Sequence, residues 1–149
     1  MFKHKSSTSA WIAALMAALF AIAPQTRADD AAAAAITKLV KIDQIVGTGI
    51  SAHDGSEVKV NYVGWVYDEK AADHHGAKVD SSYDRGQPIT FVLGDSRMIA
   101  GWNQGIDGMR TGGKRTLLIP PKLAYGGRHV GPVPPHATLV FDIELLAVK

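Results

Sequence analysis

A short glycine-rich segment, residues 99–109 (IAGWNQGIDGM), places the tightest constraint on how this chain can fold. Its large apolar residues recur at helical spacing, which puts them on one face of an α-helix. The three glycines fall on the other side in this pattern, and each weakens a helix by roughly 1 kcal/mol relative to alanine. Such a helix does not persist alone, so it requires a sheet to lie on. The residues of its apolar face are Ile99, Trp102, Ile106 and Met109.

The sequence on both sides of this helix alternates apolar and polar residues, as strands with one buried face do. The clearest strand is 57–67 (EVKVNYVGWVY), and residues 68–78 and 124–136 are expected to be loops. A cap at Asp95 or Ser96 and an end at Gly108 or Gly112–Gly113 would delimit the helix. The pattern indicates an α+β fold, an antiparallel sheet with a helix on one face. Further extended segments are expected at 38–46, 79–82, 89–93, 114–119 and 139–145.

The first 28 residues have the layout of a secretory signal peptide. Residues 3–5 (KHK) are basic, 10–23 form an apolar run of 14 residues, and 26–28 (TRA) offer a small-residue cleavage site. The run is short for a membrane span, although an uncleaved anchor is the alternative. No span is expected after cleavage. The expected organisation is a signal peptide at 1–28, a flexible tether at 29–37 and a folded domain at 38–149.

Charge and cysteine content exclude several classes of function. Cleavage after Ala28 removes three basic residues and leaves 13 basic and 14 acidic ones, so the net charge falls from +2 to about −1. The basic character of the whole chain is therefore no evidence for nucleic-acid or membrane binding. The sequence has no cysteine, which excludes a disulfide, a thiolate nucleophile and a cysteine-ligated metal. We expect a protein exported to the periplasm or the outside of the cell.

No motif for covalent or metal-dependent catalysis is present, neither GxSxG nor HExxH nor a phosphate-binding loop. His74 and His75 beside Asp73 are adjacent on one segment, so a solvated loop is favoured over a metal site. A nucleophile at Ser81–Ser82 with His129 as its base is the other alternative, but nothing in the sequence activates it. We expect neither a metal nor a cofactor.

Aromatic residues gather instead at strand ends and in loops, together with a single acid, Asp80. A concave site lined mainly by apolar groups binds a hydrophobic ligand. The pattern alone therefore indicates a candidate pocket. Its aromatic members are Tyr62, Trp102, Tyr125 and Phe141.

Several separated motifs in this chain resemble those of the FKBP-type peptidyl-prolyl cis-trans isomerases, in the order and at nearly the spacing of that family. The resemblance covers residues 58–149, and the long segment before Val79 is similar to that of bacterial single-domain members. It implies an antiparallel five-stranded β-sheet curled around one short α-helix, with a pocket between them. The motifs are 62–65 (YVGW), 79–82 (VDSS), 101–102 (GW), 124–126 (AYG) and 134–146 (PPHATLVFDIELL).

The resemblance also implies roles for individual residues. Trp102 would form the floor of the pocket, Asp80 a polar group at its edge, and Tyr125 a hydroxyl donor to a substrate carbonyl; these are the catalytic candidates. Val79 and Ile89 stand where better-known eukaryotic members carry aromatic residues, and the loop after Tyr125 is one residue shorter. These departures bear on catalytic strength and macrolide affinity more than on the fold. The substrate-binding candidates are Tyr62, Val79, Ile89, Phe91, Met98, Ile99, His129 and Phe141.

The implied function is the acceleration of X–Pro bond rotation in exported polypeptides. The implied partners are unfolded or partly folded proline-containing polypeptides and macrolide inhibitors, and no nucleic acid. A non-catalytic holdase chaperone or peptide-binding module that uses the same pocket is one alternative, and a structural domain with an aromatic core is another. A buried Tyr125 hydroxyl with an internal partner would favour the structural domain.

Overall fold

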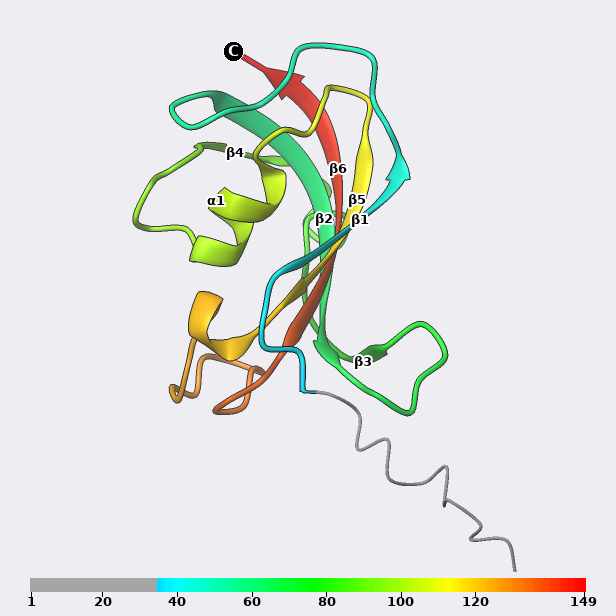
Figure 1. The fold of residues 1–149 in the computed structure, drawn as a ribbon, viewed down its shortest axis with the longest axis vertical. Coiled ribbons are helices and arrows are strands. Elements are labelled where there is room, and N and C mark those ends of the chain that lie inside the picture. The colour runs from blue at the N-terminus through cyan, green and yellow to red at the C-terminus, as the bar shows by residue number, and fades with distance from the viewer. Residues whose placement is uncertain (1–34) are drawn as a thin grey trace, which may run out of the picture. The chain divides into compact units, whose positions relative to one another are not determined.

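The computed structural model describes residues 35–149, and Figure 1 shows their fold. The predicted signal peptide at 1–28 and all but the last residues of the predicted tether at 29–37 lie outside the described residues. Within 35–149, no helix is long and apolar enough to cross a membrane.

Six strands form one antiparallel sheet in the described part of the chain, with one short α-helix and one 3₁₀ turn. The fold class predicted from the sequence is therefore confirmed. The elements are β1 (Val40–Ile45), β2 (Glu57–Tyr67), β3 (His75–Ser81), β4 (Ile89–Val92), α1 (Ala100–Ile106), β5 (Lys114–Ile119), η2 (Pro121–Leu123) and β6 (Leu139–Val148).

The six strands occupy five positions in the sheet, in the order β1-β5-β6-β2-β3, with β4 beside β2. Residues 57–60 of β2 pair with β4, whereas residues 63–67 pair with β3 along the same edge. The expected count of five strands differs from the observed six because two short strands share one edge of β2. The place where β2 changes partner, at Asn61 and Tyr62, is next to the site described below.

The core lies between the sheet and α1, which sits against one face of the curved sheet (Figure 1). Strand β2 supplies alternate residues to it, because successive side chains of a strand point to opposite faces. Val58, Val60 and Tyr62 are buried, whereas Glu57 and Lys59 are exposed. Burial of such side chains stabilises the fold by about 1.5–3 kcal/mol each.

Two glycines of α1 face the sheet, contrary to the expectation that they lie away from the packed side. Gly101 and Gly105 are buried with Trp102 and Ile106. A Cβ at Gly101 would lie 2.3 Å from the side chain of Ile119, and one at Gly105 would lie 2.3 Å from that of Leu117. The glycines therefore allow the helix to approach β5 closely.

The start of the helix differs from the prediction, whereas its end agrees with the predicted alternative at Gly108. Its N-cap is Ile99, with no side-chain capping hydrogen bond, rather than Asp95 or Ser96. The helix ends at Ile106, and Gly108 follows with a φ of +81°, a conformation that favours glycine. Because no side chain caps its start and it has only seven residues, the helix depends on packing against the sheet.

The sequence predicted a loop over 68–78, and the end of this prediction is wrong because β3 already begins at His75. The imidazole of His75 stacks on Trp65, with ring centroids 3.7 Å apart and planes 4° from parallel. His74 stacks in the same way on Tyr67. These contacts extend the strand through polar residues that have no hydrophobic alternation. The two histidines are therefore packed on aromatic rings of β2 rather than free in a solvated loop.

Candidate active site

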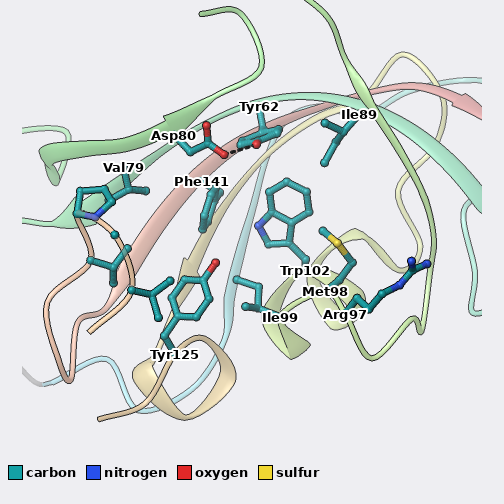
Figure 2. A pocket seen from close by; sticks show the side chains of 14 residues that line it. Tyr62, Val79, Asp80, Ile89, Arg97, Met98, Ile99, Trp102, Tyr125 and Phe141 are labelled. Carbon is teal, nitrogen blue, oxygen red and sulfur yellow. Dashed lines mark hydrogen bonds between the residues drawn. The ribbon is translucent and has the colours of Figure 1, made fainter. Parts of the chain in front are cut away.

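A pocket with a volume of about 360 Å³ opens between the sheet, α1 and the loop that precedes β6 (Figure 2). Val79 and Asp80 lie at one end of it, and Arg97 and Met98 lie at the other. Nine of the predicted site residues line it together: Tyr62, Val79, Asp80, Ile89, Met98, Ile99, Trp102, Tyr125 and Phe141.

Trp102 lies in the middle of this pocket with its side chain only 3% exposed. The rings of Tyr62 and Phe141 stand nearly perpendicular to the indole, at centroid distances of 4.8 and 5.2 Å. Such edge-to-face pairs contribute about 0.5–1.5 kcal/mol beyond area burial. The buried indole Nε1 has no hydrogen-bond acceptor among the described residues. The floor of the pocket is thus a buried aromatic surface held by ring contacts on two sides.

A hydrogen-bonded triad forms the polar edge of the pocket. The Tyr62 hydroxyl donates to Asp80 Oδ2 at 2.5 Å and accepts from Arg85 Nη2 at 2.6 Å. Arg85 also donates to Asp80 Oδ1, and the guanidinium lies 5.6 Å from the centroid of the Tyr62 ring. Sequence reasoning missed Arg85. Its closeness to the VDSS motif was the only available signal.

These contacts set the protonation states at the edge. Burial alone would raise the pKa of Asp80, but hydrogen bonds from Tyr62, Arg85 and the Ser81 backbone hold it below its usual value. Burial, followed by the bond to Asp80, raises the pKa of Tyr62. At neutral pH the carboxyl is therefore ionised and the phenol is neutral. Neither group is poised to transfer a proton.

The backbone of Tyr62 is held where β2 lacks a strand partner on this edge. Its N–H donates to the hydroxyl of Ser82 at 2.9 Å, and its carbonyl accepts from the Ser82 N–H at 3.0 Å. The Ser82 hydroxyl also donates to the side chain of Asn61. Ser82 is fully buried in this structural role, which argues against the nucleophile considered from the sequence.

Tyr125 faces the pocket from the loop that follows η2. Its hydroxyl points toward the space between Phe141 and Ile99 (Figure 2). It is half-buried and has no hydrogen-bond partner among residues 35–149. The hydroxyl is therefore free to bind a ligand, and the condition that would favour a purely structural aromatic core is not met.

Two of the predicted site residues do not line the pocket. Phe91 packs behind the floor, with its ring 5.7 Å from that of Trp102, and His129 is exposed on the loop. The structure adds five lining residues that sequence reasoning missed, of which the last four belong to one loop with no hydrophobic period to reveal it: Arg97, Val130, Gly131, Pro132 and Val133.

The described residues contain no group of three or more histidine and carboxylate side chains that could hold a metal ion. His75 is flanked by Asp73 and Asp142, with nitrogen–oxygen distances of 3.2 and 3.7 Å, on the β2–β3 edge away from the pocket. The chemistry available in the pocket is therefore apolar contact together with hydrogen bonding by Tyr62, Asp80 and Tyr125.

Comparison with known proteins identifies this arrangement. Residues 49–146 match the family model described as FKBP-type peptidyl-prolyl cis-trans isomerase. An FK506-binding protein of Neisseria meningitidis serogroup A is 48% identical over 103 residues, covering 68% of this chain and 88% of that protein. The peptidyl-prolyl cis-trans isomerase FPR2 of Saccharomyces cerevisiae is 52% identical over 101 residues, covering 67% of this chain and 70% of that protein.

Solved structures agree. AtFKBP13 is similar with a TM-score of 0.65 and 40% identity, over 77% of this chain and 96% of that one. FkpA from Escherichia coli has the same TM-score and 43% identity, over 76% of this chain and 49% of that one. The chain belongs to the FKBP-type peptidyl-prolyl cis-trans isomerase family. It is an enzyme that catalyses the cis–trans isomerisation of X–Pro peptide bonds.

Proposed function

We propose that this isomerase acts on exported polypeptides and accelerates X–Pro rotation by binding the twisted amide in the pocket over Trp102. The observation that carries the proposal is the convergence of Trp102, Tyr125 and the Tyr62–Asp80 pair on one apolar pocket. Rotation about a peptide bond has a barrier of about 18–20 kcal/mol, because it breaks amide resonance. No covalent bond is made or broken, so the pocket needs no nucleophile and no proton donor.

An apolar floor lowers this barrier by differential binding. The planar amide is the more charge-separated form, and the twisted amide is the less polar one. Transfer from water to the dry surface of Trp102 therefore costs the planar form more than the twisted form. Each 1.4 kcal/mol of such preference is a tenfold gain in rate.

The polar groups would orient the substrate on this floor. The free Tyr125 hydroxyl would donate to a substrate carbonyl, while the proline ring lies on Trp102 between Tyr62 and Phe141. Asp80, ionised and fixed by Tyr62 and Arg85, would face the reacting amide from the other end of the pocket. With the proline ring held on Trp102, the other side of the amide can turn against it while the substrate stays oriented.

Rate measurements on short X–Pro peptides test this mechanism. The full chain should accelerate cis-to-trans exchange, and Tyr125→Phe should lower kcat/KM about threefold to tenfold, as expected for the loss of one hydrogen bond. Trp102→Phe should lower it further by removing half of the floor. Tyr83→Phe and Trp65→Phe are the matched controls, because each makes the same change at a residue that does not line the pocket.

Equal rates for Tyr125→Phe, Trp102→Phe and the unchanged chain would contradict the pocket mechanism. A folded chain that binds proline peptides without accelerating their exchange would instead support the holdase. FK506, after which the Neisseria relative is named, should compete with the peptides, since it would occupy the same apolar surface.

The export part of the proposal rests on residues 1–28, which have the layout of a signal peptide. Expression of the full chain in a Gram-negative host, followed by mass measurement of the periplasmic fraction, tests it. The expected product begins at Asp29. Recovery of the 149-residue chain from the cytoplasm would contradict it.

A further inference from the structure

A second groove, with a volume of about 400 Å³, adjoins the pocket. The two share Arg97, Met98, Ile99 and Tyr125 in their linings. A polypeptide seated by its proline on Trp102 would therefore continue into this groove on leaving the pocket over Met98 and Ile99. The groove is therefore continuous with the pocket rather than a separate surface.

Both charged residues that line this groove are arginines. Arg128 is exposed and forms no ion pair and no side-chain hydrogen bond with any residue of 35–149. Arg97 is 87% exposed and is fixed by Asp95, whose carboxylate accepts from its Nε at 3.0 Å and from its Nη2 at 2.5 Å. No carboxylate lines the groove itself.

The turn that carries Arg97 is braced from α1. The Asn103 side chain donates to the backbone carbonyl of Asp95 at 3.0 Å and accepts from the Gly94 N–H at 3.0 Å. Hydrogen bonds from Arg97 hold the pKa of Asp95 at about 2, so this acid stays ionised and offsets one of the two arginine charges. No residue that lines the groove compensates the charge of Arg128.

We propose that this groove is a subsite for residues that flank the proline, and that the unpaired Arg128 makes it prefer polypeptides with a carboxylate side chain there. The inference rests on the proposed function and deepens it by naming a substrate class. The opposite end of the pocket offers no such preference, since Arg85 and Asp80 already pair with each other.

Peptide series that differ in one residue test the subsite. Glutamate, glutamine or lysine is placed within about three residues of the proline on either side, the reach of an extended chain from the pocket. With the full chain at low salt, kcat/KM should be about threefold to fivefold higher for glutamate than for glutamine at one or more of these positions, as an exposed ion pair provides. Added salt should remove the difference.

Arg128→Gln should abolish this preference while leaving the glutamine peptide at its original rate. Lys41→Gln is the matched control, because it removes the same charge from an exposed position on β1 and should preserve the preference. Acceleration of the glutamine peptide shows that the isomerase itself works. Equal rates for the three series, or a preference that survives Arg128→Gln, would then overturn the subsite alone.

Discussion

Replacement of Gly105 by alanine tests whether the helix under the pocket is placed by close packing on β5. A Cβ at this position would lie 2.3 Å from Leu117 Cδ1 and 2.8 Å from Cδ2, and Leu117 is fully buried. The carbonyl of Gly105 also accepts from Arg115 Nη1 at 2.8 Å, which resists a shift of the helix. Leu117 or the helix must therefore move by about 1 Å to restore ordinary contact.

Two opposing terms set the magnitude. Overpacking of a closed core costs about 1–3 kcal/mol. Alanine in place of glycine in a helix contributes about 1 kcal/mol in the other direction. Because the clash falls on a fully buried leucine, the packing term prevails, and we expect Gly105→Ala to lower the free energy of unfolding, by up to about 2 kcal/mol.

Urea unfolding measures this change, with Gln104→Ala as a control at an exposed position of the same helix. Leu117→Ala alone should cost about 2–5 kcal/mol. The double variant should lose less than the sum, because the new methyl group enters the space that Leu117 leaves. A more stable Gly105→Ala chain, or additive losses in the cycle, would refute the argument.

Three further predictions concern the pocket. The pKa of Asp80 is lower in the folded chain than its value of about 3.9 in the unfolded chain, so the ionised carboxylate stabilises the fold at higher pH. The free energy of unfolding should therefore fall as the pH drops below about 4, and the urea midpoints of Tyr62→Phe should fall less steeply over this range. An unchanged slope would contradict the role of the triad. Val79→Phe should tighten proline-peptide binding about threefold to tenfold by adding aromatic surface beside Asp80, as calorimetry would show, and weaker binding would count against it. His129→Ala should leave kcat/KM unchanged within about twofold, because His129 is exposed outside the pocket lining; a larger loss would place it on the substrate path.

Hydrophobic period predicted β2 and β6 well because both strands alternate buried residues with more exposed ones along much of their length. The limits expected for 57–67 are those of β2, and the Trp102 segment is helical as its spacing predicts. The same rule failed at His75, where stacking on Trp65 replaces alternation. It also failed for Gly105. A glycine in a helix can either weaken that helix or allow it to pack closely on a strand, and only the neighbouring strand decides which.

The site residues that could be predicted are mainly those in or near the separated sequence motifs. Nine expected residues line the pocket, and six of them lie inside the quoted motifs. Arg97 and residues 130–133 were missed because they enter the lining through loop geometry, which depends on local turn hydrogen bonds rather than on a hydrophobic period. Arg85 was missed because its role is a contact with Asp80 and Tyr62 rather than a pattern in sequence.

The anchoring of Tyr62 at both ends has a consequence for how substrate leaves. Ser82 holds its backbone, and Asp80 and Arg85 hold its hydroxyl, so this wall is in place before a polypeptide arrives. A preformed wall neither closes over its ligand nor reopens to release it, and the ordering cost of binding falls mainly on the substrate. One substrate can then replace another without rearrangement of this wall, as a catalyst requires when each folding chain offers several different prolines.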